Sequence, residues 1–476
     1  MTTRPNTSAV TFLVSVATNV APLFGVFALG WSPETLAVVY AIELLVAVPF
    51  AGVKALFAAQ PPDYDELRRP KGDTALKSGK REDISVGPSD LNRRRGSVRI
   101  ADWLPPVYPR NVSFATRWFG TLVTLTAVFL AVLSQSIDVV ATLSQPTVAS
   151  SAASLVVSHV AVTERQYFRG HQYETATPGG LFEAATGEAL VVVAVFTVAS
   201  GVGPTGALAV FVAVKLFAEW RGYRGEPITG TDRAPGELPS VSVPETEPTA
   251  VVRPARRVVL TAALWRAVES VLKFAPGFAL AWAALTRSSV ESGLPVALAC
   301  FGLGPTVVVV LKTVEYTLTH GTLVYQRRGG TILAYDELTE TPQWAVAVGE
   351  VRQVSLHGGH LADRLYGTRT VAIRPTGAEY DNEITHVRAD DRVVEAFELP
   401  SSVSNRGRLD WRVTGVTVAL AGCAVAAAGW ALSQAPSVSV YFVAFGAPLS
   451  VAVFGWLWRR ATTDTRVSRL TEARRT

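Results

Sequence analysis

The chain has 476 residues, of which 49% are hydrophobic and 17% are charged, and its formal net charge is +5. This composition is too apolar for an ordinary soluble protein and is typical of a polytopic membrane protein. Because the basic residues lie beside apolar runs, where lipid head groups account for them, the charge excludes a nucleic-acid partner.

Apolar runs of about 20 residues, the length of a bilayer-crossing helix, recur along the chain. In the first half they cover residues 9–30, 36–58, 118–140, 147–162 and 188–220. The last run fits two short helices that meet at Gly201–Gly206, or one kinked helix. Two hairpins follow at residues 258–314 and 413–458. We therefore predict an all-α polytopic membrane protein with about ten transmembrane helices.

Lys and Arg are almost absent from every second connection between these runs, where Arg287 is the single basic residue. None occurs between Pro5 and Val53, between Trp118 and Glu164, or between Gly170 and Val214. By contrast, residues 60–117 hold twelve basic residues and the last eighteen residues hold six. Basic residues that flank spans stay on the cytoplasmic side. This alternation predicts a multi-pass protein of the cell membrane with both termini in the cytoplasm.

The runs and their connections predict six regions. They are a helical membrane domain of about six spans (1–220, with the basic cytoplasmic loop 60–117), a Pro-rich linker (221–257), a membrane hairpin (258–314), a β-domain (315–400), a second membrane hairpin (413–458) and a basic cytoplasmic tail (459–476). Six prolines among Ser, Thr and Glu in Gly222–Pro254 are typical of a disordered tether.

The segment between the two hairpins carries strand signals. Runs rich in Val, Ile, Thr and Tyr alternate with Gly-containing turns, at Thr317–Arg327, Ala345–Leu356, Thr368–Arg374 and Glu383–Arg388. Asp390 then caps a short amphipathic helix at Asp391–Leu399. We expect one small cytoplasmic β-domain, a curved sheet closed by a C-terminal helix, inserted between the membrane hairpins.

Four stretches of this segment carry a family resemblance: Tyr316–Leu323, Val351–Val354, Leu361–Thr368 and Val371–Ile373. With them, residues 294–399 resemble the bacterial pleckstrin-homology-like (PH-like) domain of small membrane proteins. That resemblance implies a barrel-like β-fold capped by a helix, without an established enzymatic activity. The acidic turn Tyr335–Gln343 departs from the family pattern.

A second resemblance covers residues 10–220. It rests on Asn19–Leu23, Gly25-Val26, Gly30–Ser32, Leu36, Tyr40–Glu43, Lys54 and Lys215. This half resembles the domain-of-unknown-function 6498 family of archaeal and bacterial multi-spanning membrane proteins. The resemblance implies a helical membrane fold and assigns no reaction. The haloarchaeal members of that family would fit the Arg-rich, Met-poor residue usage of this chain.

One polar cluster is predicted within the first hairpin. Folding the chain about Trp31–Pro33 brings Asn19 and Glu43 to about the same depth, and Tyr40 precedes Glu43 by three residues on the same helical face. A carboxylate at that depth is costly and is usually kept for a role. The cluster fits either a clamp between two helices or a proton-carrying or substrate-binding site. We favour the clamp, and we predict no catalytic residue.

Two groups of basic residues are predicted to lie at a membrane surface, where they would meet anionic lipid head groups. They are Arg93, Arg94 and Arg95 in the first loop, and Arg253, Arg256 and Arg257 before the seventh apolar run.

Four histidines in the predicted β-domain raise the question of a metal site: His320, His357, His360 and His386. They are scattered over predicted strands and a Gly loop, and no Cys accompanies them. We predict no metal and no cofactor.

These observations favour a non-enzymatic membrane scaffold or interaction protein. Its partners would be the lipid bilayer and an unidentified protein bound at the β-domain. The alternative is a transporter or intramembrane enzyme that uses Asn19, Tyr40 and Glu43.

Overall fold

A computed structural model describes part of the chain in detail. The described residues are 30, 32–61, 91–118, 120, 141–142, 145–182, single positions between 206 and 220, 241–287, 290–357, 361–376, 381–388, 391–399 and 403–404. The chain divides into two compact units. The first comprises Met1–Gln60, Arg117–Pro235 and Pro276–Thr306, and the second Pro61–Thr116, Gly236–Ala275 and Val307–Thr476.

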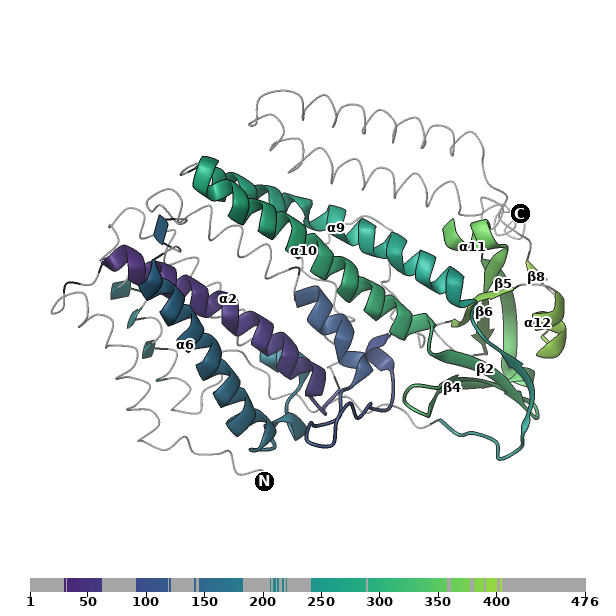
Figure 1. The fold of residues 1–476 in the computed structure, drawn as a ribbon. Helices are drawn as coiled ribbons and strands as arrows, with labels where there is room; N and C mark the ends of the chain where they lie inside the picture. The colour runs from purple at the N-terminus through teal and green to yellow at the C-terminus, as the bar shows by residue number, and fades with distance from the viewer. Residues whose placement is uncertain are drawn as a thin grey trace, which may run out of the picture. The chain divides into compact units, whose positions relative to one another are not determined.

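The first unit contains two long helices that pack side by side, α2 (Pro33–Phe57) and α6 (Pro146–Val162) (Figure 1). Proline occupies the first turn of α6, where its missing N–H is tolerated. Helix α6 continues into one π-helical stretch, η3 (Thr163–Phe168), and the 3-10 turn η4 (Gln172–Glu174) follows. The rings of Phe57 and Phe168 meet edge to face at 5.0 Å.

The second unit begins its β-structure with an antiparallel sheet in the order β1-β2-β3-β4. The strands are β1 (Pro248–Val252), β2 (Leu323–Arg328), β3 (Thr331–Asp336) and β4 (Thr341–Ala347). Gly329 and Gly330 form the two-residue loop between β2 and β3, and Gly329 has a φ of +54°. Glycine adopts this left-handed conformation without steric cost, so the tight hairpin can form.

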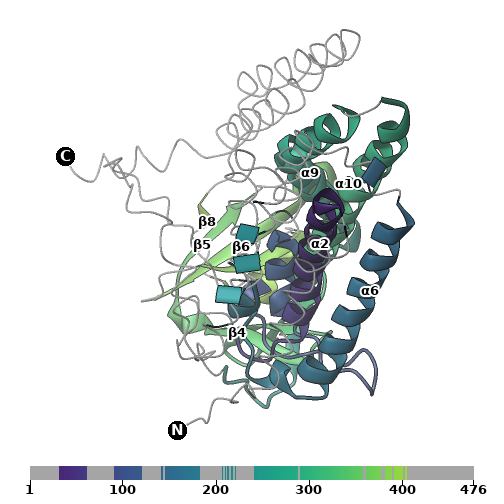
Figure 2. The ribbon, with the colours of Figure 1, turned by 90° about the vertical axis from the view of Figure 1, so that its left-hand side faces the viewer.

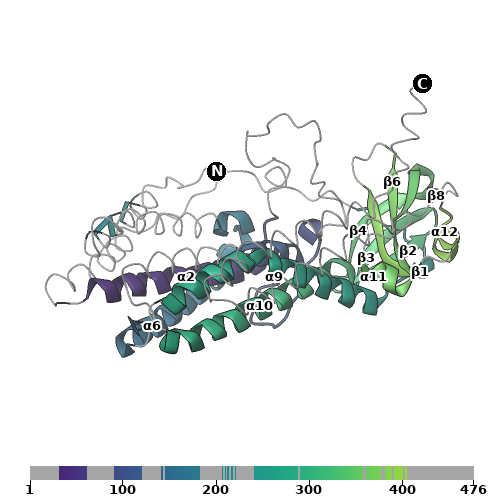
Figure 3. The same cartoon turned by 90° about the horizontal axis from the view of Figure 1, so that it is seen from above.

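The other sheet has the order β7-β6-β5-β8. Its strands are β5 (Val351–His357), β6 (Thr368–Pro375), β7 (Asn382–Arg388) and the two-residue β8 (Val403–Ser404), which pairs with β5 in parallel. Three short helices accompany it: η5 (Val348–Glu350), α11 (Leu361–Tyr366) and α12 (Asp391–Ala396). Figure 3 shows the strands of both sheets gathered at one place, with α12 beside them.

One hydrophobic core joins the two sheets. It includes Tyr325, Ile332 and Trp344 from the first sheet, Ile373 from the second, and Phe397 just after α12. Each buried side chain of this size contributes roughly 1.5–3 kcal/mol to folding. We call the two sheets with α11 and α12 the β-domain.

Two long helices adjoin this domain in sequence, α9 (Arg256–Arg287) and α10 (Val290–His320), and they run side by side (Figure 2). The start of α9 and the end of α10 pack together with α11 around a small apolar cluster. Val259, Ala263, Tyr316 and Ala362 belong to it. The β-domain is therefore anchored to the helix ends by buried side chains.

The helices of the described part of the chain contradict the predicted membrane fold. We find none among them that combines the length and the apolar character needed to cross a lipid bilayer. The two sheets likewise contradict an all-α fold. The predictions of about ten transmembrane helices, of a multi-pass protein and of localisation in the cell membrane with cytoplasmic termini are therefore wrong.

Charge accounts for the error at α9, and length accounts for it at α6. Helix α9 includes Arg266, Glu269 and Lys273 within its predicted span, and α10 includes Lys312 and Glu315 towards its end. Helix α6 has only 17 residues. Predicted spans at residues 9–30 and 413–458 lie outside the described residues.

Within the β-domain, the predicted strands at Thr368–Arg374 and Glu383–Arg388 and the helix starting at Asp391 are confirmed. The strand predicted from Thr317 is wrong in its first half, because α10 continues to His320. The predicted run Ala345–Leu356 is divided by η5 between β4 and β5.

The predicted linker also contains structure. Its residues Pro248–Val252 form β1, which pairs with β2 at the edge of the first sheet. The β-branched Val251 and Val252 favour this extended pairing, and proline is tolerated at the first position of a strand.

Candidate functional site

Three buried side chains from distant elements form a continuous line of hydrogen bonds. The imidazole of His386 in β7 lies 2.8 Å through Nδ1 from a carboxylate oxygen of Asp363 in α11. Its Nε2 lies 2.7 Å from the hydroxyl of Tyr316 near the end of α10. The Thr368 hydroxyl donates to the same Asp363 oxygen at 2.6 Å. We call Asp363, His386 and Tyr316 the buried polar chain.

The elements around these residues fix their positions. His386 has a φ of +53°, a left-handed conformation that is uncommon within a strand. Its carbonyl accepts a hydrogen bond from the Ala255 amide at 2.9 Å, just before α9 begins. His386 is thus hydrogen-bonded through its backbone to the residue before α9, and through its ring to α10 and α11.

The polar chain is closed to solvent. His386 and Asp363 are 0% exposed and Tyr316 is 9% exposed. Burial raises the pKa of the Tyr316 hydroxyl well above its usual value; the Arg266 charge lowers this pKa by a smaller amount, and the Asp363 charge raises it. The Asp363 carboxylate accepts a hydrogen bond from Nδ1 of His386, and the Tyr316 hydroxyl is bonded to Nε2 of the same ring. The arrangement stabilises a protonated, unreactive hydroxyl.

A second set of polar contacts adjoins this chain. The ring of His320 lies 5.6 Å from that of His386, and its Nδ1 is 3.2 Å from the Thr385 hydroxyl. The Thr385 amide donates to the hydroxyl of Tyr325 in β2 at 3.1 Å. These contacts connect the polar chain to the first sheet.

A hydroxyl, an imidazole and a carboxylate in line are the parts of a nucleophilic triad. Here the hydroxyl is buried and its pKa is raised, which is the reverse of an activated nucleophile. Both ring nitrogens of His386 are engaged by protein groups. Within the described ranges, no three His, Cys, Asp or Glu side chains lie together in a way that could hold a metal ion. The geometry therefore fits a clamp.

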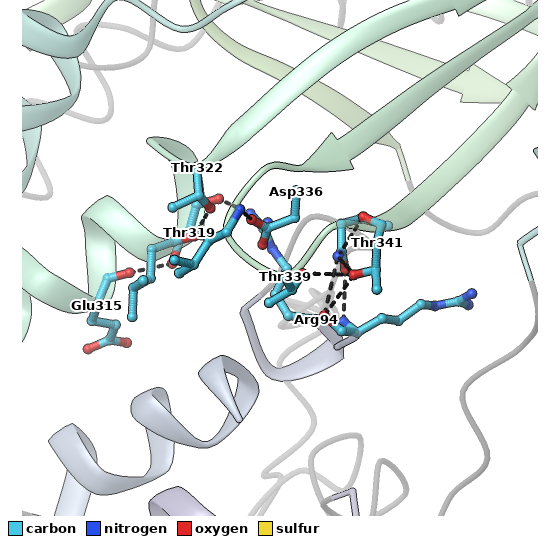
Figure 4. A network of polar contacts seen from close by, with 11 residues as sticks. Arg94, Glu315, Thr319, Thr322, Asp336, Thr339 and Thr341 are labelled. Carbon is cyan, nitrogen blue, oxygen red and sulfur yellow. Dashed lines mark hydrogen bonds and ion pairs between the residues drawn. The ribbon is translucent and has the colours of Figure 1, made fainter. Parts of the chain in front are cut away.

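A second buried polar contact joins the segment before residue 116 to the β-domain (Figure 4). The Arg94 guanidinium donates to the Asp336 carboxylate in β3 at 2.9 Å, and both side chains are 2% exposed. It also donates to the carbonyl of Thr319 in the last turn of α10. We call Arg94 and Asp336 the arginine lock.

The residues after Arg94 continue this attachment. The Arg95 amide donates to the Gln343 side chain at 2.8 Å, and the Arg95 carbonyl accepts from the Thr341 hydroxyl at 3.1 Å. Gly96 has a φ of +83°, and a Cβ there would lie 2.6 Å from the Cβ of Thr339. Only glycine fits at this close approach.

The polar cluster predicted in the first hairpin is not assembled by the described residues. Asn19 lies outside them. Tyr40 lies in α2, but its side chain is outside the described set, whereas Glu43 is half-buried in the same helix. The clamp predicted for Asn19, Tyr40 and Glu43 stays a prediction.

The basic residues predicted at a membrane surface lie in different environments. Arg94 is buried in the arginine lock, and its neighbours Arg93 and Arg95 are partly exposed. Arg253 forms an exposed ion pair with Glu337 at 2.7 Å. Arg256 and Arg257 are exposed in the first turn of α9.

The sequence did not single out Asp363, Asp336 or Tyr316. His386 was noted only as one of four scattered histidines. The contacts among Asp363, His386 and Tyr316, and the contact between Arg94 and Asp336, join residues 23 to 242 positions apart, so spacing carries no signal for them. A charged residue within a run of strand-forming residues was the one available indication for Asp336.

In the part of the chain that the structure describes, fold and site define an α+β protein. Long helices are joined to a β-domain that a buried polar chain and an arginine lock hold together. Residues 1–227 match the model of a family of unknown function, DUF6498. The predicted likeness of the N-terminal half to this family is thereby confirmed, whereas the match does not support the archaeal, multi-spanning membrane context expected with it. No curated protein and no solved structure matches the chain.

Proposed function

We propose that the chain is a non-enzymatic scaffold protein whose β-domain is a PH-like interaction module. The single observation that carries the proposal is the burial of the polar chain: the groups best suited to chemistry are bonded to one another and removed from solvent. They stabilise a platform instead of acting on a substrate.

The order of elements in the β-domain supports the PH-like assignment. Three consecutive antiparallel strands, β2 to β4, are followed by three more, β5 to β7, and then by the short helix α12. A barrel-like pair of sheets closed by a C-terminal helix is what the resemblance implies. The additional strands β1 and β8 extend the two sheets at their edges.

The alternative function, a transporter or intramembrane enzyme built on Asn19, Tyr40 and Glu43, has less support. It needs helices that cross a bilayer, and the described helices contradict this. The protein partner expected at the β-domain stays part of the scaffold proposal.

Two histidines allow a matched test, in the full chain, of whether the polar chain is buried. His386 is 0% exposed, whereas the side chain of His171 is 66% exposed. Diethyl pyrocarbonate should modify His171 in the folded protein and should reach His386 only after denaturation, as read by peptide mass spectrometry. Modification of His386 in the folded protein at a rate similar to that of His171 would show an open, reactive site and overturn the proposal.

Substitutions of the same two histidines distinguish the stability that comes from the side-chain hydrogen bonds of His386 from the effect of a left-handed backbone. Both histidines have left-handed backbones, with φ of +53° for His386 and +52° for His171, and Asn tolerates that region well. His386→Asn cannot bridge Asp363 and Tyr316, so it should lower the free energy of unfolding by roughly 2–4 kcal/mol. His171→Asn should change it by less than about 0.5 kcal/mol. Equal urea midpoints for the two variants would contradict the clamp.

A further inference from the structure

Helix α9 presents an exposed apolar stripe over its first turns. Leu260, Leu264, Trp265 and Val268 are each 45–51% exposed. They are spaced by one to four residues, so they share one side of a helix with 3.6 residues per turn. The opposite side, which includes Val259 and Ala263, packs into the cluster shared with α10 and α11. The stripe is therefore an outer face of the second unit.

Helix α11 extends this apolar surface. Leu365 is 66% exposed and Tyr366 is 49% exposed. The Thr261 hydroxyl, on the same side of α9 as the stripe, lies 3.4 Å from the Tyr366 hydroxyl. The two helices thus form one surface, which we call the α9–α11 face.

Basic residues border the α9–α11 face. Arg256 and Arg257 are exposed in the first turn of α9, and no Asp or Glu occurs between Arg256 and Val268. Arg257 precedes Leu260 and Leu264 by three and seven residues, on the same side of the helix. Large exposed apolar patches usually mark a binding surface, and this one has a positively charged end.

We propose that the α9–α11 face docks onto an anionic lipid surface, with the start of α9 lying in the plane of the head groups. Leu, Trp and Val side chains facing lipid, with Arg beside them, are the composition of an interfacial helix. Trp265 and Tyr366 suit the boundary between head groups and acyl chains. This contact is peripheral and needs no bilayer-crossing helix. It does not depend on the buried polar chain, so it can fail while the scaffold proposal stands.

The charge requirement is tested by vesicle flotation of the full chain. Vesicles of phosphatidylcholine with roughly 30% phosphatidylserine should bind the protein more strongly than pure phosphatidylcholine vesicles, with the difference decreasing in high salt. Arg257→Gln should lower the partition coefficient about fivefold. Arg352→Gln, an equal charge change at an exposed position on β5, should leave it within about twofold. An equal decrease of the partition coefficient in both variants would show that binding depends on net charge alone, and would overturn the proposed site.

The apolar requirement is tested with two exposed tryptophans. Trp265 is 45% exposed on the α9–α11 face, and Trp103, which lies between the 3-10 turns η1 (Leu91–Arg93) and η2 (Pro109–Asn111), is 81% exposed. Trp265→Ser should lower binding to the anionic vesicles about tenfold. Trp103→Ser should leave it unchanged. Circular dichroism melts of both variants check that each remains folded.

Three outcomes would overturn the proposal. The first is the absence of binding to either kind of vesicle. The second is binding to both kinds with equal strength, or equal losses for the two tryptophan variants. The third is a lipid-free dimer that Trp265→Ser converts to a monomer in analytical ultracentrifugation, because the face would then be an interface between two copies of the chain.

Discussion

The two units use polar side chains in opposite ways. In the β-domain, buried polar contacts join residues far apart in sequence, as between Arg94 and Asp336, which are 242 positions apart. In the first unit, the ion pairs of the described residues are local and exposed, such as Arg169 with Glu164. The long-range hydrogen bonds of its described residues end on backbone carbonyls: the Ala59 amide donates to the Tyr173 carbonyl and the Tyr167 hydroxyl to the Lys54 carbonyl, each at 2.8 Å.

This difference determines how each unit responds to substitution. An exposed ion pair adds little to the free energy of folding, because each charge is already well solvated by water. A buried charge that loses its partner keeps its full desolvation penalty. The β-domain should therefore be sensitive to single polar substitutions that the first unit tolerates. Three predictions test that contrast.

The largest effect is expected at the arginine lock. Arg94→Met leaves the Asp336 carboxylate buried without its guanidinium partner, although the Leu338 amide still donates to it, and should lower the free energy of unfolding by about 3–5 kcal/mol. Urea denaturation measures this loss. Arg93→Met, at the partly exposed neighbouring residue, should change stability by less than about 1 kcal/mol.

A double variant tells a lost charge pair from lost packing. Arg94→Met with Asp336→Leu removes both charges and should recover part of the loss, because a buried pair can be replaced by apolar residues at little cost. A double variant as unstable as the sum of the two single variants would show that the lock acts through packing alone.

A smaller effect with a defined pH dependence is expected at Glu383 in β7. Burial raises the pKa of this carboxyl, and Asp381 raises it further, while His386 lowers it in part. A raised folded-state pKa means that the contribution of Glu383 to stability is present below the unfolded value and lost as pH rises through the folded value. Glu383→Gln should therefore be more stable than the parent at pH 7, by less than about 2 kcal/mol. The difference should vanish below about pH 4.

Glu398 supplies the control of opposite sign. Its hydrogen bond to Arg327 lowers the pKa of its carboxyl, so the ionised form is favoured in the folded state. Glu398→Gln should lower stability above the usual carboxyl pKa and lose its effect in acid. Urea denaturation across the pH range gives both curves, and curves of the same sign would contradict the assigned causes.

The smallest effect is expected in the first unit. Glu164→Gln removes the ion pair with Arg169, whose side chain is 76% exposed, and should change stability by less than about 0.5 kcal/mol. Hydrogen exchange of the amides in η3 and η4 provides a local measurement. A loss of protection there as large as that caused in the β-domain by Arg94→Met would remove the contrast between the units.

Local patterns predicted part of the fold. The alternating Val, Ile and Thr residues of β6 and β7 and the Asp391 start of α12 depend on neighbours in sequence, and these elements lie where they were expected. The N-terminal resemblance was also correct. The strand start at Thr317 was wrong because the same Thr-rich residues continue α10, where the Thr319 hydroxyl donates to the Glu315 carbonyl.

The candidate site could not be predicted in the same way. Asp363, His386 and Tyr316 belong to three elements, and each residue alone reads as an ordinary polar residue. Arg94 was interpreted as a lipid-facing charge from its neighbours Arg93 and Arg95, whereas it is buried against Asp336. Apolar runs were interpreted as spans from length and composition, which the described helices contradict.

The sequence by itself determined the local β-propensity and turns of the β-domain and the family likeness of its first 227 residues. These depend on short-range sterics and residue order. Only the tertiary structure decided which charges are buried and which are exposed. It buries Arg94 and His386 and leaves Arg257 and Trp265 on an outer face. The physical reason is that the burial of a charge and the identity of its partner depend on groups that folding brings together. The position of one residue in the sequence indicates neither.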